Sequence, residues 1–171
     1  MITVTAETTL SSSLDDTWTA LGRRATYLSF PGISAPPAEA GAPRAALRHE
    51  LELPIVDRQE QTATLSVRRA GRTRERRFAM RGTAVAIEGC WRLEPGADGV
   101  RAHLTLSYEI GDALKTHAVN TLRSRSPLPI RTDADAILSR AVDEFFETRF
   151  AEHARDFCER VRTRFDAGRA S

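Results

Sequence analysis

The chain has 171 residues, of which 41% are hydrophobic and 28% are charged, and its formal net charge is +2. This composition excludes an intrinsically disordered chain, and the charge is too small to indicate nucleic-acid binding by itself. No apolar run approaches the length of a membrane span, and the N-terminal segment lacks the basic start and apolar core of a signal peptide. We therefore expect one domain over residues 1–171, located in the cytoplasm.

The N-terminal part of the chain predicts a strand followed by two short helices. Residues 2–10 alternate between two faces and are rich in β-branched side chains, as is typical of a half-buried strand. Ser13 and Asp16 resemble a capping box at the start of a short amphipathic helix. A second short helix is expected over residues 24–33, and the proline-rich residues 34–43 predict an irregular, exposed connection.

Between residues 46 and 110 the hydrophobic pattern has a period of two. It divides into five segments with links of hairpin length, which predicts an antiparallel meander with one apolar face. An apolar face of this kind needs a cover. The strands are expected around residues 47–53, 63–67, 74–80, 85–93 and 100–110.

The stretch from Thr132 to Phe165 predicts a long amphipathic helix that covers the sheet. It holds five of the seven phenylalanines, and its apolar residues form two adjoining stripes, one through Ile137 and Phe145, the other through Leu138 and Phe146. A helix of about thirty residues is roughly 50 Å long, so we expect a kink or a frayed end.

Residues 111–131, before this helix, allow two interpretations. Residues 113–122 are compatible with a short helix, whereas the Ser-Pro-Leu-Pro sequence at residues 126–129 forbids a regular element. The segment is either a flap over one end of the structure or an ordered linker.

The cysteines and the known sequence motifs exclude several classes of protein. Cys90 and Cys158 lack C-x-x-C spacing, so neither a disulfide framework nor a zinc site is indicated, and we expect both to be small buried hydrophobic residues. There is no G-x-S-x-G, Walker or G-x-G-x-x-G motif and no clustered set of metal ligands. This counts against a hydrolase, an NTPase, a dinucleotide-dependent oxidoreductase and a metalloenzyme, and we expect no cofactor and no metal.

The order of the expected elements resembles the helix-grip fold of the START/Bet v 1-like superfamily, which includes bacterial polyketide cyclases and aromatases, lipid-transfer proteins and carbon monoxide dehydrogenase accessory proteins. Three stretches carry the resemblance: TVTAETTLSSSLDDTWTALG is similar to the opening strand and helix, TYLSFPGI to the second helix, and GCWRLEPGADGVRAHLTLSYEI to the last hairpin. The resemblance implies an α+β fold in which a curved antiparallel sheet of six to seven strands wraps around a long C-terminal helix, with two short helices after the first strand.

The resemblance also implies a deep, mainly apolar cavity between the sheet and the long helix, suited to a polyketide, a lipid or a similar ligand. Aromatic and aliphatic side chains aimed at one space agree with this expectation, although the same side chains are able to fill a core. Arg149 and His153, one helical turn apart, either flank the cavity or are solvated. The expected substrate-binding residues are Tyr27, Phe30, Phe78, Met80, Trp91, Leu104, Leu106, Phe145, Phe146 and Arg149.

Polar side chains in phase with apolar strand faces are the candidates for chemistry, because burying them unpaired is costly. His49 is either a general acid or base, or a hydrogen-bonded core histidine. Arg76 either stabilises an enolate or polarised carbonyl of a ligand, or lies at the wet end of its strand. Tyr108 either donates to a ligand oxygen or bonds to backbone. We expect these three to be the catalytic residues of an enzyme.

The leading hypothesis is a cyclase-like enzyme that folds a flexible, oxygenated hydrophobic substrate and assists ring closure or dehydration. The alternatives are a non-catalytic carrier of a hydrophobic ligand and an accessory protein for the assembly of another enzyme. The seven arginines between Arg68 and Arg81 predict a solvated outer face rather than a nucleic-acid surface. The expected partner is a small hydrophobic ligand, without nucleic acid or membrane insertion, and both a monomer and a homodimer are compatible with the sequence.

Overall fold

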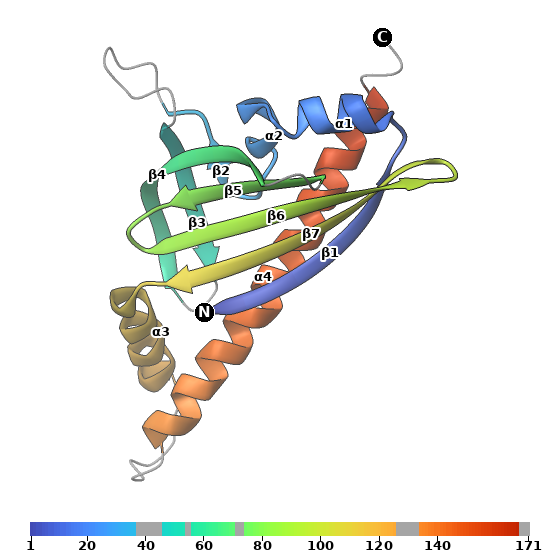
Figure 1. Ribbon diagram of the computed structural model, residues 1–171. Coiled ribbons are helices and arrows are strands. Elements are labelled where there is room, and N and C mark those ends of the chain that lie inside the picture. Colours follow the sequence, from blue (N-terminus) through green and yellow to red (C-terminus); the bar gives the residue numbers. More distant parts are fainter. Residues whose placement is uncertain (37–45, 54–55, 71–73, 126–133, 168–171) are drawn as a thin grey trace.

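The computed structural model describes residues 1–36, 46–53, 56–70, 74–125 and 134–167. A curved antiparallel sheet of seven strands wraps around one long helix, which confirms the predicted α+β helix-grip fold (Figure 1). The elements in chain order are β1 (Ile2–Leu10), α1 (Leu14–Ala20), α2 (Arg24–Tyr27), β2 (Ile33–Ser34), β3 (Ala46–Leu53), β4 (Val56–Ala70), β5 (Glu75–Arg81), β6 (Val85–Gly96), β7 (Gly99–Ile110), α3 (Asp112–Arg125) and α4 (Ala134–Ala167).

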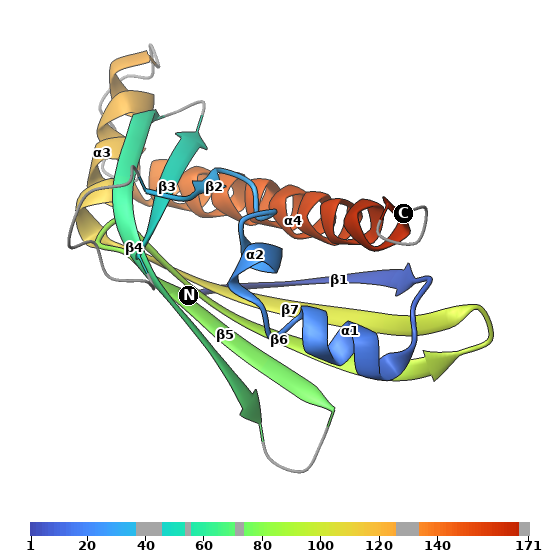
Figure 2. The ribbon, with the colours of Figure 1, turned by 90° about the horizontal axis from the view of Figure 1, so that it is seen from above.

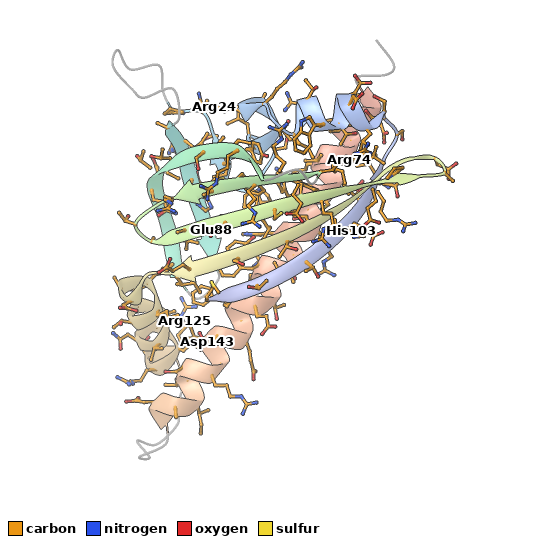
Figure 3. All side chains as sticks on the ribbon, in the orientation of Figure 1. Arg24, Arg74, Glu88, His103, Arg125 and Asp143 are labelled. Carbon is orange, nitrogen blue, oxygen red and sulfur yellow. The ribbon has the colours of Figure 1, made fainter. Side chains whose placement is uncertain are left out.

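The strand order of the sheet is β1-β7-β6-β5-β4-β3-β2, so the predicted meander from β3 to β7 is confirmed. The first strand pairs with the last one, from Ile2 opposite Tyr108 to Leu10 opposite Val100. Because side chains alternate along each strand, one face of the sheet turns toward α4 and the other faces solvent. Glu88 and His103 stand on the solvent face (Figure 3).

The region after α1 differs from the prediction of a helix over residues 24–33. Helix α2 comprises one turn, and the chain then forms the two-residue strand β2, in which Ile33 pairs with His49. After Tyr27 the chain continues in turns, in which the N–H groups of Ser29 and Phe30 bond to carbonyls three residues earlier. Gly32, at a φ of 75°, then directs the chain into β2. Most of the predicted connection over residues 34–43 and the proline-containing residues 126–129 lie outside the described residues.

Helix α4 is one unbroken helix of 34 residues, so the expected kink is not observed along its described length (Figure 2). Its first turns extend past the sheet, where α3 lies beside them instead of the sheet (Figure 1). Ion pairs from Lys115 to Asp143, at 3.2 Å, and from Arg123 to Asp135 join the two helices. The ambiguous segment after β7 is therefore helical up to residue 125 and covers one end of the structure.

The stripe of α4 that faces the sheet is the one through Leu138 and Phe146, both of which are buried. The other stripe begins on the solvent side, since Ile137 is 60% exposed. Cys158 is buried as expected, whereas Cys90 lies on the outer face of β6 and is partly exposed, which corrects the expectation for that residue. Within the described part of the chain, no helix has the length and apolar character that a bilayer-spanning helix needs.

Candidate functional site

The interior between the sheet and α4 is built from aromatic rings at two neighbouring places. At the first, Phe157 of α4 lies 4.9 Å from Phe30, 5.6 Å from Trp91, 6.2 Å from Phe78 and 6.3 Å from Tyr27, measured between ring centroids. These tilted arrangements are favourable for aromatic pairs. Four predicted binding residues from three parts of the chain therefore meet around one phenylalanine that was not among the predicted binding residues.

At the second place, Tyr108 of β7 stacks on Phe150 of α4, with ring centroids 3.8 Å apart and planes 3° apart. Phe150 in turn stacks on Phe146 at 5.7 Å. Phe145 lies 6.0 Å from Phe146 but is only half-buried, so it flanks the interior instead of facing its centre. Phe146, not Phe145, is the predicted binding residue of this helix that the structure places inside.

The predicted cavity residues are packed as a core in this structure. Those on the sheet and α4 that line its centre are at most 1% exposed, and a water-sized space beside them would leave part of their surface accessible. A ligand therefore enters between these side chains only if the rings move apart. The residues concerned are Met80, Trp91, Leu104, Leu106, Tyr108 and Phe146.

Two polar atoms in this aromatic interior are buried without a hydrogen-bond partner among the described residues: the indole Nε1 of Trp91 and the hydroxyl of Tyr108. Buried donors without acceptors are rare in proteins, because each forfeits its hydrogen bonds to water. Burial also raises the pKa of Tyr108 above its ordinary value, so the phenol keeps its proton and remains a donor. Each atom is available to donate to an oxygen that the described residues do not supply.

His49 is buried on the inner face of β3, and its hydrogen bond defines its tautomer. The amide of Gln61 is oriented by the backbone N–H of Ala84, which donates to Oε1 at 2.8 Å. Its Nε2 therefore donates to His49 Nδ1 at 3.1 Å, which places the imidazole proton on His49 Nε2. Burial, together with His153 nearby, lowers the pKa of His49 to about 4. At neutral pH this arrangement suits donation from Nε2 better than proton abstraction.

Arg76 connects β5 to α1. Its Nη2 donates to the carbonyl of Trp18 at 2.9 Å, and its guanidinium lies 4.0 Å from the centroid of the Trp18 ring. It also approaches Gly22, where an added Cβ would come within 3.0 Å of Nη1. These contacts favour a role in anchoring α1 over a role toward a ligand.

The described contacts of the three predicted catalytic residues, His49, Arg76 and Tyr108, have no residue in common, so the prediction that they form one catalytic group stays a prediction. The sequence prediction omitted Gln61, the partner of His49. The alternation of the strand could have identified it, because Gln61 falls on the same inner face of β4 as Ala63 and Leu65.

A separate open pocket of about 430 Å³ lies between β2 and α4. Arg149, one of the predicted binding residues, lines this pocket instead of the aromatic interior, and His153 and Arg160 lie beside it on α4. Burial and the charge of Arg149 lower the pKa of His153, so this imidazole is mainly neutral at pH 7. The remaining lining residues are Pro31, Gly32, Ile33, Ser34 and Glu50.

No protein-family model and no curated protein sequence matches the chain. Its structure is similar to that of the Zhui aromatase/cyclase from Streptomyces sp. R1128, with a TM-score of 0.58 and 14% identity over 96% of this chain and 93% of that chain. TTHA0849 from Thermus thermophilus gives a TM-score of 0.49 and 17% identity over 93% and 96% of the two chains. A START superfamily protein from Mycobacterium smegmatis gives 0.44 and 14% over 89% and 96%. At these identities the likeness concerns the fold.

Proposed function

On the premise that the chain has the START/Bet v 1-like helix-grip fold, we propose that it binds an oxygenated hydrophobic molecule, of polyketide or lipid type, between the sheet and α4. The fold places a curved sheet over one helix (Figure 2), and the buried residues of their facing surfaces are mainly aromatic and aliphatic, with His49 and Gln61 as polar exceptions on the sheet. Interiors of this composition with a few fixed polar groups are typical of sites for small hydrophobic ligands.

The observation that carries the proposal is the pair of buried donors, Trp91 Nε1 and Tyr108 OH, without acceptors in the described structure. A core that only stabilises the fold gains nothing from a phenol at position 108, because phenylalanine would make the same stack on Phe150 without the cost of an unmade hydrogen bond. Carbonyl or hydroxyl oxygens of a ligand would satisfy the two groups. The displaced rings would then enclose the ligand body.

Two matched ligands test the proposal. Acetylnaphthalene and ethylnaphthalene have nearly the same shape and differ in one carbonyl oxygen, and each is titrated against the fluorescent probe phenylnaphthylamine bound to the protein. We expect the ketone to compete about 3- to 10-fold better, as one hydrogen bond of about 1 kcal/mol predicts. Tyr108→Phe should reduce that preference.

Tyr27→Phe is the matched control, because the Tyr27 hydroxyl already donates to the carbonyl of Leu21 at 2.7 Å. It should leave the preference for the ketone unchanged. No binding of phenylnaphthylamine by the wild type, or an equal preference for the ketone in wild type and in Tyr108→Phe, would contradict the proposal.

A cyclase-like activity is the second candidate, and the arrangement of His49 and Tyr108 favours it. Both present donors from the inner face of the sheet, and a flexible chain with several carbonyl groups held by such donors is confined to few conformers, which promotes ring closure. The similarly folded Zhui protein is an aromatase/cyclase by its name. In this proposal Arg76 anchors α1, while His49 and Tyr108 orient the substrate.

Turnover of a poly-β-keto thioester, followed by mass spectrometry of the products, tests this activity. Tyr108→Phe and His49→Leu should lower turnover more than they lower probe affinity. Arg76→Gln should lower stability and leave turnover per folded molecule unchanged. If the thioester is unchanged after incubation with the wild type, the cyclase-like activity is contradicted and binding without catalysis is the proposed function.

A further inference from the structure

We propose that the pocket between β2 and α4 binds the acidic end group of an amphiphilic ligand, with Arg149 and Arg160 as its cationic partners. The inference rests on the proposed function and specifies the class of ligand as a hydrophobic acid whose apolar body lies in the aromatic interior. For brevity this pocket, lined by Pro31–Ser34, Glu50, Arg149, His153 and Arg160, is called the mouth pocket.

The helical spacing of the basic residues places them on one wall of the mouth pocket. Arg149, His153 and Arg160 follow each other at intervals of four and seven residues, which puts them on the same face of α4. The other lining residues are Glu50 and residues 31–34, which form the turn before β2 and β2 itself. A volume of about 430 Å³ is within the range of small-molecule sites, roughly 300 to 1,000 Å³.

The lining itself carries two cationic side chains and one anionic side chain, while Glu152 and Asp156 lie near these cations outside the lining. Two guanidinium groups, of Arg149 and Arg160, stand against one carboxylate, of Glu50. Arg149 is held by Glu152 through Nη1 at 2.6 Å, which uses one edge of its guanidinium. Its Nε is shielded from water and has no acceptor among the described residues. A ligand carboxylate would bond to the accessible part of this guanidinium, whose side chain is 34% exposed, and would reach Nε only if the side chain turns.

His153 connects the mouth pocket to the aromatic interior. Its ring lies 6.5 Å from the ring of Phe30 and 6.3 Å from that of Phe150, and Phe150 carries the stack with Tyr108. The same imidazole lines the mouth pocket. A ligand with its acidic group at Arg149 and Arg160 would therefore pass His153 with its apolar body and reach the unpartnered hydroxyl of Tyr108.

At Gly32 the backbone of the turn before β2 lies close to β3. Gly32 has a φ of 75°, and an added Cβ would lie 2.2 Å from the carbonyl oxygen of Glu50 and 3.6 Å from Cδ2 of His49. The turn therefore lies directly against β3, and His49 and His153 stand between the mouth pocket and the interior at this point. No larger side chain than glycine fits there.

Two fluorescent probes with a common aromatic body test the inference. Anilinonaphthalene sulfonate carries an anionic group and phenylnaphthylamine does not, so the ratio of their affinities reports recognition of the charge. We expect the wild type to prefer the sulfonate about tenfold and expect Arg149→Gln and Arg160→Gln each to reduce that preference to within about threefold of unity.

Arg162→Gln is the matched control, because Arg162 is also on α4 and also pairs with a glutamate three residues away, at 2.5 Å, but lies outside the mouth pocket. It should keep the preference of the wild type. The inference would be overturned if the wild type binds the neutral probe but does not prefer the sulfonate, or if all three variants keep the same sulfonate preference. Either outcome would leave the proposed function standing. Failure of the wild type to bind either probe would overturn both.

Discussion

Two tyrosines of the interior, Tyr27 and Tyr108, are buried to the same degree, with 0% and 1% of their surface exposed. Burial raises the pKa of both phenols, so both are neutral donors. They differ in what they donate to. The hydroxyl of Tyr27 bonds to the carbonyl of Leu21, between α1 and α2, whereas that of Tyr108 has no acceptor in the described structure.

The difference distinguishes a structural tyrosine from a candidate ligand-binding tyrosine. Around Tyr27, its own hydroxyl bonds to the Leu21 carbonyl and Arg76 bonds to the Trp18 carbonyl, although Thr17 Oγ1 and Trp91 Nε1 nearby have no partner among the described residues. The hydroxyl of Tyr108 lies between the apolar surfaces of the sheet and α4, where the described residues supply no hydrogen-bond acceptor. Equal burial therefore does not imply an equal role, and the hydrogen bond of the hydroxyl is the property that separates the two tyrosines.

The largest expected change in stability comes from removing the ring of Phe157, on which Tyr27 packs. Phe157→Ala deletes a side chain that contacts four other rings, and it should lower the free energy of unfolding by about 3–5 kcal/mol. Urea unfolding followed by circular dichroism measures this. Ile137→Ala, at an exposed position of the same helix, should change it by less than about 0.5 kcal/mol.

A smaller effect comes from His49, a third buried polar group, and depends on pH. In the folded protein the pKa of His49 is about 4, below the ordinary 6.5, so the unfolded chain binds the imidazole proton more readily. The stabilisation is present above pH 6.5 and is lost as the pH falls toward and through 4, by about 3 kcal/mol at most. His49→Gln should make the free energy of unfolding less dependent on pH between 4 and 6.5, measured by urea unfolding at several pH values. His117→Gln, at an exposed position, should leave this dependence as in the wild type.

The smallest and most direct test exchanges the two hydroxyl groups for hydrogen. Tyr27→Phe leaves the carbonyl of Leu21 without its donor and should cost about 1–2 kcal/mol of stability. Tyr108→Phe removes a group that has no partner among the described residues and should be neutral or slightly stabilising. Equal destabilisation by the two substitutions would mean that Tyr108 has a structural partner and would remove the distinction between the two tyrosines.

Much of the fold follows from local patterns in the sequence. Strict alternation from Val100 to Ile110 predicted β7, and the phase of His49 with its apolar neighbours predicted that it is buried. The two apolar stripes of the terminal helix did not show which one faces the sheet. That choice depends on packing against β1 and β7, which lie far away in sequence.

The arrangement of the candidate site was less accessible to prediction. The mouth pocket joins β2, a strand of two residues without a periodic signal, to residues of α4 more than a hundred positions later. Arg76 was in phase with the inner face as predicted, but its partner is the backbone carbonyl of Trp18, which no side-chain pattern indicates. Contacts of these kinds arise only when the sheet has curved around the helix.

The pairing of β1 with β7 has a consequence for how the chain folds. Nine residues at the beginning of the chain find their hydrogen-bond partners about a hundred residues later, and α4 then packs on β1. Contacts of such high sequence separation carry a large loop-closure entropy and slow folding. During synthesis the first strand emerges long before its partner, so it stays unpaired until the chain up to Ile110 has left the ribosome.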